Sequence, residues 1–128
     1  MKPYVDDIEK ITQANETFRT VLFTTPLSQL VVMSLKPKED IGQEMHRIDQ
    51  FLRVESGEGQ AILDGQEYEL KDGSALVVPA GVEHNLVNTS AEKPLKLYTI
   101  YTPPEHKDGT VHVTKADAEA DEHDHFKE

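Results

Sequence analysis

The chemistry available to this chain comes from histidines and carboxylates, because it has six His, twenty-four Asp and Glu, and no Cys. The lack of cysteine excludes disulfides, thiolate metal sites and a cysteine nucleophile. The most patterned segment, GSALVVPAGVEHNLVN, carries its marked residues at Gly73, Pro79, Gly81, His84 and Asn88. Glycines supply turn conformations that other residues resist, and proline fixes the chain before a strand. We therefore expect a strand that carries an inward-facing His84.

The spacing of these five residues resembles the second motif of the cupin superfamily at each of its defining positions. The resemblance covers roughly residues 18–102 and is closest to small single-domain cupins of the RmlC-like type. It implies an all-β fold, the double-stranded β-helix (jelly-roll) barrel, with a metal ion in its interior.

The first cupin motif corresponds to EMHRIDQFLRVESG at 44–57. His46 and Gly57 match the family pattern, whereas Glu44 stands where the family has a histidine and Gln50 where it has a glutamate. Lys38 stands in the place of the opening glycine. The short distance between this segment and the second motif is the one expected of a compact cupin.

Strand alternation supports the ligands that the resemblance implies. In an extended segment Glu44, His46 and Gln50 share one face, which continues into Leu52 and Val54. Polar groups on such a face are costly to bury unless they bind something. The predicted metal ligands are Glu44, His46, Gln50 and His84. The alternative is a metal-free site in which these side chains satisfy one another.

Two imidazoles, one carboxylate and one amide oxygen suit zinc, iron, manganese, nickel or cobalt, so the predicted cofactor is a divalent metal ion of unspecified identity. The same residue types, in another order, hold zinc in phosphomannose isomerases. The resemblance therefore favours a metal-dependent, isomerase-like enzyme acting on a small oxygenated molecule such as a sugar. One alternative is a non-heme iron dioxygenase using Glu44, His46 and His84. Another is a non-catalytic module that binds small molecules.

Period-2 alternation predicts the barrel strands and helical periodicity is nearly absent. The expected strands are 18–24, 28–35, 59–64, 66–70, 75–78 and 94–101. Asp64-Gly65 between two of them predicts a tight hairpin turn. Of Tyr98 and Tyr101 on the last strand, at least one is expected to line the core or the pocket.

The chain divides into an N-terminal extension (1–17), the barrel (18–102), a loop packing near the barrel (103–114) and an acidic tail (115–128). Residues 5–12 are compatible with a helix or a strand. The tail has few large apolar groups and is expected to be frayed or a short exposed helix.

The remaining histidines lie outside the motifs. His106 and His112 are expected to be solvated loop residues, with a lid that carries a general base as the alternative. His123 and His125 in the tail would bind metal only adventitiously.

The net charge of −11 disfavours nucleic acid and strongly anionic substrates. The first residues lack the apolar run of a signal peptide, and no stretch is long and apolar enough for a membrane helix. These features predict a cytoplasmic protein without a membrane partner. The apolar strand LVVMSL, which invites coverage on both faces, predicts a homodimer.

Overall fold

Nine strands and two short helices make up the part of the chain, residues 1–126, that the computed structural model describes. In chain order these are α1 (Ile8–Ala14), β1 (Arg19–Thr24), β2 (Gln29–Leu35), β3 (Asp49–Ser56), β4 (Glu58–Leu63), β5 (Gln66–Lys71), β6 (Ala75–Val78), β7 (His84–Asn88), β8 (Leu95–Thr102), β9 (Val111–His112) and α2 (Lys115–Ala120). Over the same residues, no helix is long and apolar enough to cross a membrane.

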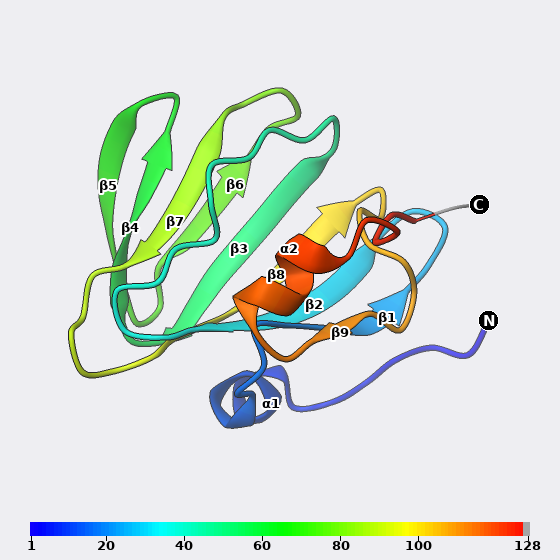
Figure 1. Ribbon diagram of the computed structural model, residues 1–128. Helices are drawn as coiled ribbons and strands as arrows, with labels where there is room; N and C mark the ends of the chain where they lie inside the picture. The colour runs from blue at the N-terminus through cyan, green and yellow to red at the C-terminus, as the bar shows by residue number, and fades with distance from the viewer. Residues whose placement is uncertain (127–128) are drawn as a thin grey trace.

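The strands form two antiparallel sheets that face each other (Figure 1). One sheet has the order β6-β3-β8-β2-β1-β9, and the other has the order β5-β4-β7. This arrangement confirms the predicted all-β jelly-roll barrel. The six expected strands are present with ends that differ by one residue. The six do not include β3 and β7, which lie in the two motifs, or β9, whose two residues are too few to show a period.

The core lies between the sheets and explains the alternation. Along β8, Leu95, Leu97, Thr99 and Tyr101 are buried, and the residues between them are more exposed. On β2 both faces are covered, because Val31 and Val32 are 0% and 1% exposed and α1 packs on the outer side (Figure 1). The apolar strand LVVMSL is thus covered within one chain, and the homodimer stays a prediction without that support.

The segment left undecided between helix and strand becomes α1, capped by Asp7, whose Oδ1 accepts a hydrogen bond from the Lys10 backbone N–H at 3.1 Å. The β4–β5 hairpin turns at Asp64 and Gly65, with φ of 49° and 81°, as a type I′ turn requires. Lys38, in the place of the family's glycine, also has a positive φ of 66°. Its Nζ donates to the Thr89 carbonyl at 2.7 Å, which helps to hold this strained conformation.

The C-terminal segment, residues 115–126, differs from a simple frayed tail. Its first part is the expected short exposed helix, α2, with a capping box between Thr114 and Asp117. Beyond α2, however, Asp124 is buried at 8% exposure and hydrogen-bonded to His106. The segment therefore returns to the body of the protein. Residues 127–128 of the predicted tail lie outside the described residues.

Candidate metal site

A short β-bridge joins the two sequence motifs. The backbone N–H of Glu44 donates to the His84 carbonyl, and the N–H of His84 donates to the Glu44 carbonyl, both at 2.8 Å. His84 begins β7 and is 2% exposed, so its side chain faces the interior as predicted. The bridge places the side chains of residues forty positions apart next to each other.

The expectation that Glu44, His46 and Gln50 share one strand face is wrong. The chain bends at residues 47–48, and β3 begins only at Asp49. His46 is instead held by the turn of the second motif, because the Gly81 N–H donates to the His46 carbonyl at 2.8 Å. The loop before β3 therefore owes its position to contacts that strand alternation does not describe.

Glu44, His46 and His84 each offer a ligand atom, and these atoms lie within 4.8 Å of one another. His46 Nε2 is 2.6 Å from a Glu44 carboxylate oxygen, and the two groups form an ion pair when the imidazole is protonated. His84 Nε2 has no hydrogen-bond partner within residues 1–126. Buried polar atoms seldom lack partners. An unpartnered His84 Nε2 close to Glu44 and His46 suits a third partner shared by the three side chains, such as a metal ion.

The orientation of His84 suits such a role. Its Nδ1 lies 3.0 Å from the Val82 carbonyl, which can only accept a hydrogen bond. Nδ1 therefore carries the proton and Nε2 carries the free lone pair. Metal-binding histidines are commonly fixed in this way, by a hydrogen bond from the nitrogen that does not bind the ion.

Gln50, the fourth predicted ligand, lies on β3. It is 3% exposed on β3, and its Nε2 donates to Thr99 Oγ1 at 3.0 Å. Its Oε1 is buried without a partner among the described residues. Gln50 lies opposite Tyr101 of β8, whose ring packs edge-on against His46 with centroids 6.1 Å apart. Its place in a ligand set stays a prediction.

The charges around His46 favour a cation. Burial opposes ionisation of Glu44, but the adjacent His46 imidazole outweighs it and lowers the pKa of Glu44. Burial likewise disfavours protonated His46, but the contact with Glu44 and the charge of Glu105 raise the pKa of His46. Glu105 Oε1 lies 3.5 Å from His46 Nδ1. Both shifts have the sign expected of a place in the protein where the surrounding carboxylates favour positive charge.

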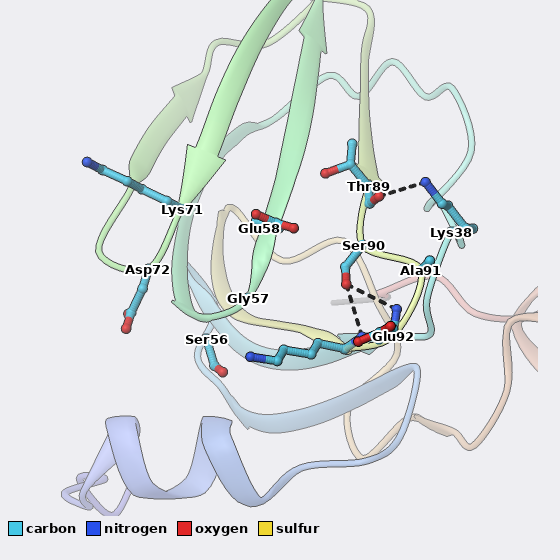
Figure 2. Close-up of a pocket in the computed structure, with 11 residues that line it drawn as sticks. Lys38, Ser56, Gly57, Glu58, Lys71, Asp72, Thr89, Ser90, Ala91 and Glu92 are labelled. Carbon is cyan, nitrogen blue, oxygen red and sulfur yellow. Dashed lines mark hydrogen bonds between the residues drawn. The ribbon is translucent and has the colours of Figure 1, made fainter.

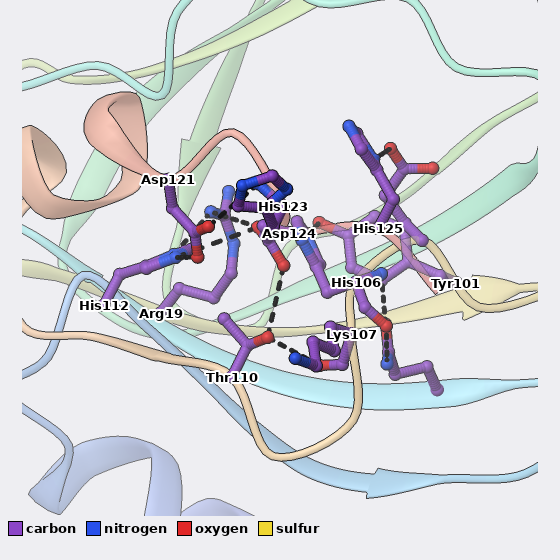
Figure 3. Close-up of polar contacts among 12 residues, drawn as sticks. Arg19, Tyr101, His106, Lys107, Thr110, His112, Asp121, His123, Asp124 and His125 are labelled. Carbon is purple, nitrogen blue, oxygen red and sulfur yellow. Dashed lines mark hydrogen bonds and ion pairs between the residues drawn. The ribbon is translucent and has the colours of Figure 1, made fainter. Parts of the chain in front are cut away.

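A second cluster lies beside the C-terminal segment and comprises His112, Asp121 and Asp124 (Figure 3). Its groups are already paired, since His112 Nε2 bonds to Asp121 Oδ2 at 3.0 Å. The Arg19 guanidinium lies 3.1 Å from His112 Nδ1 and 3.8 Å from Asp124. A fixed positive charge there disfavours a metal ion, so we assign this cluster no metal.

His106 and His112 are buried at 6% and 3% exposure, so the expectation that they are solvated is wrong. His123 and His125 are exposed, as expected of tail residues. Sequence reasoning did not single out Arg19, which is buried at the start of β1. An arginine at an inward position of an apolar strand could have indicated a buried acidic partner. The burial of Asp124 could not be recognised from the sequence, because several other acidic residues surround it.

An open groove of about 700 Å³ lies just beyond the end of β7 that is opposite to His84. Figure 2 shows the residues that line it. It runs along the β3–β4 turn at Gly57 and the loop after β7, which includes Ser90 and Lys93. Its lining mixes lysines with acidic groups and contains none of the predicted ligands. The groove therefore offers no support for the metal chemistry, which depends on the interior cluster.

Comparison with known proteins agrees with the motifs. The family model described as "Cupin domain" matches residues 31–101. The chain is 50% identical to the protein YrkC of Bacillus subtilis (strain 168), over 94% of this chain and 68% of that protein. The crystal structure of BH2720 from Bacillus halodurans superimposes with a TM-score of 0.91 at 45% identity, covering 94% and 96% of the two chains. KdgF from Halomonas sp. shares the fold, with a TM-score of 0.62 at 23% identity over 70% of this chain and 79% of that chain.

Proposed function

The chain belongs to the cupin family, and from this premise we propose that it binds a divalent metal ion through Glu44, His46 and His84, with Gln50 as the fourth ligand. The observation that carries the proposal is the close approach of three ligand atoms within 4.8 Å, with His84 Nε2 unpartnered among the described residues. Nitrogen and oxygen donors in this mixture suit zinc and its first-row neighbours.

We further propose that the site serves a metal-dependent, isomerase-like enzyme whose substrate is a small oxygenated molecule such as a sugar. A bound metal ion would supply Lewis-acid polarisation of a carbonyl or hydroxyl oxygen. Glu44 would neutralise part of the ion's charge, while the Val82 carbonyl would keep His84 Nε2 directed inward. The dry interior around Tyr101, which is 2% exposed, would exclude bulk water from the bound molecule.

A second candidate function is that of a non-heme iron dioxygenase. Glu44, His46 and His84 are two histidines and one carboxylate, the set that holds iron(II) with open positions in many oxygenases. A non-catalytic module that binds small molecules would use the same site without turnover. The dioxygenase would require iron(II) and consume oxygen, the isomerase would convert its substrate without consuming oxygen, and the binding module would convert nothing.

The metal site is tested by removing metal from untagged protein with a chelator and titrating zinc, iron(II), manganese and nickel by calorimetry. We expect one ion per chain and a melting temperature that rises with metal concentration, because the ion binds only the folded state. Glu44→Gln, a nearly isosteric change that removes the charge, should weaken binding. The matched control, His123→Ala with His125→Ala, should not. Binding unchanged in Glu44→Gln would contradict the site.

The activity is tested with the metal that binds tightest. Conversion between aldoses and ketoses supports the isomerase, and oxygen consumption by the iron(II) form supports the dioxygenase. Thermal stabilisation by a sugar without turnover supports the binding module. Absence of all three effects across a panel of neutral sugars and hydroxy-carbonyl compounds would refute a role in small-molecule chemistry.

A further inference from the structure

A chain of buried polar groups leads from the C-terminal segment to the ring that packs against His46 (Figure 3). Asp124 Oδ2 lies 2.7 Å from His106 Nδ1, and His106 Nε2 lies 3.3 Å from the Tyr101 hydroxyl. Tyr101, His106 and Asp124 are 2%, 6% and 8% exposed. Burial of three such groups is costly unless each is hydrogen-bonded, so their connection is a defined feature of the interior.

The direction of each hydrogen bond follows from the chemistry. A carboxylate only accepts, so His106 Nδ1 donates its proton to Asp124. Burial, partly opposed by Asp124, lowers the pKa of His106 and so favours the neutral imidazole. Its Nε2 therefore accepts, and the Tyr101 O–H donates to it. The Tyr101 oxygen is left with lone pairs that can accept a hydrogen bond from another molecule.

His106 and Asp124 are themselves held firmly. Gln29 accepts from the His106 backbone N–H at 2.9 Å and donates to the His106 carbonyl at 2.8 Å. Thr110 Oγ1 donates to the Lys107 carbonyl at 2.6 Å and lies 3.2 Å from Asp124 Oδ1. Arg19 lies 3.8 Å from the other oxygen of that carboxylate. His106 is thus fixed both through its backbone, by Gln29, and through its ring, by Asp124.

Tyr101 connects this chain of groups to the candidate metal site. Its ring contacts His106 on one side, with centroids 5.0 Å apart, and His46 on another, with centroids 6.1 Å apart. It also lies opposite Gln50 in the register of β3 and β8. Tyr101 is therefore a neighbour of two predicted ligands and a partner of His106.

We propose that Asp124 and His106 are positioning residues that orient the Tyr101 hydroxyl, so that its oxygen accepts a hydrogen bond from a small molecule bound at the candidate metal site. The inference rests on the proposed function and narrows its substrate class. The molecule needs one oxygen for the metal and a nearby O–H for Tyr101, which is the chemistry of an α-hydroxy carbonyl or α-hydroxy acid. The C-terminal segment is then part of the site.

The positioning is tested without metal, by NMR of protein labelled with carbon-13 at the tyrosine ζ carbon, the atom that carries the hydroxyl. The chain has four tyrosines, and Tyr101→Phe identifies the signal of Tyr101. Asp124→Asn should shift that signal and leave the one from Tyr68, which is 46% exposed, in place. Glu122→Gln, an exposed carboxylate of the same segment, should shift neither. An unmoved Tyr101 signal in Asp124→Asn overturns the inference.

The ligand contact is tested on the zinc-loaded protein with glycolate and with acetate, which lacks the hydroxyl. One hydrogen bond contributes about 0.5–1.5 kcal/mol, so Tyr101→Phe should weaken glycolate binding roughly two- to tenfold. Acetate and zinc affinities should stay unchanged. Unchanged glycolate affinity with zinc bound overturns this inference and leaves the proposed function standing. Failure of zinc to bind the wild-type protein overturns the proposed function, and the ligand contact with it.

Discussion

If Gln50 is a ligand, replacing it by glutamate should lower the melting temperature of the metal-free protein and raise its affinity for zinc. In the metal-free protein the new carboxyl loses the donor that bonds to Thr99 Oγ1. Thr99 cannot easily compensate, because its own hydroxyl donates to the Phe51 carbonyl at 2.8 Å. A buried group left without its partner costs about 1–3 kcal/mol. At roughly 4 °C per kcal/mol for a domain of this size, the melting temperature should fall by about 4–12 °C.

In the metal-bound protein the added negative charge should strengthen zinc binding at least tenfold, or about 1.4 kcal/mol. At a zinc concentration of 100 Kd, binding stabilises the wild type by about 2.7 kcal/mol, and the tenfold tighter variant gains about 4.1 kcal/mol. The zinc-induced rise in melting temperature should therefore grow from about 11 °C to about 16 °C, since each kcal/mol corresponds to roughly 4 °C. Calorimetric zinc titration and thermal unfolding with and without zinc measure both quantities.

Gln29→Glu is the matched control. Gln29 is equally buried and also lies opposite Tyr101, on the other side of β8, but both its side-chain atoms are hydrogen-bonded. This variant should lose stability without a gain in zinc affinity. If Gln50→Glu weakens zinc binding, or if Gln29→Glu strengthens it as much, Gln50 is not a ligand.

Three further predictions concern the site, the core and acid stability. His84→Ala removes one of the two proposed nitrogen ligands and should abolish the zinc-dependent rise in melting temperature. Calorimetric zinc binding that persists in a folded variant would contradict this. Leu97→Ala should cost about 2–5 kcal/mol in urea unfolding because Leu97 is fully buried, whereas Leu27→Ala, at 76% exposure, should change stability by less than about 0.5 kcal/mol. For Asp124, burial opposes ionisation, but the bond from His106 and the charge of Arg19 lower its pKa overall. Its contribution should therefore be present above the unfolded-state pKa of about 3.9 and be lost as pH falls through the lower folded-state value. The stability gap between wild type and Asp124→Asn, from urea unfolding at pH 2–7, should close on acidification, and a gap that widens would refute the assignment.

The jelly-roll arrangement was implied by the resemblance to cupins, whereas the strands and the hairpin turn could be predicted from the sequence itself because their signals are local. Alternating apolar residues reflect the two faces of a strand, and the Asp64-Gly65 pair reflects the positive φ angles of a tight turn. The inward orientation of His84 also follows from a local pattern, since β7, the strand that ends the second motif, alternates between buried and less buried residues from His84 onward. Such features need no knowledge of what packs against them.

The arrangement of the candidate site required the tertiary structure. Glu44 and His46 lie in a loop whose course is determined by pairing with His84 and by the bond from Gly81, and strand alternation gave the wrong reason for grouping them. The burial of Asp124 likewise depends on residues that are distant in the sequence. A lone aspartate in an acidic segment has no distinguishing local pattern, and it is buried because His106 and Arg19, far away in sequence, offer it a donor and a charge. Residue types and strand periods are properties of the sequence by itself. The hydrogen-bond and charge partners that offset the cost of burying a polar group come together only once the chain has folded.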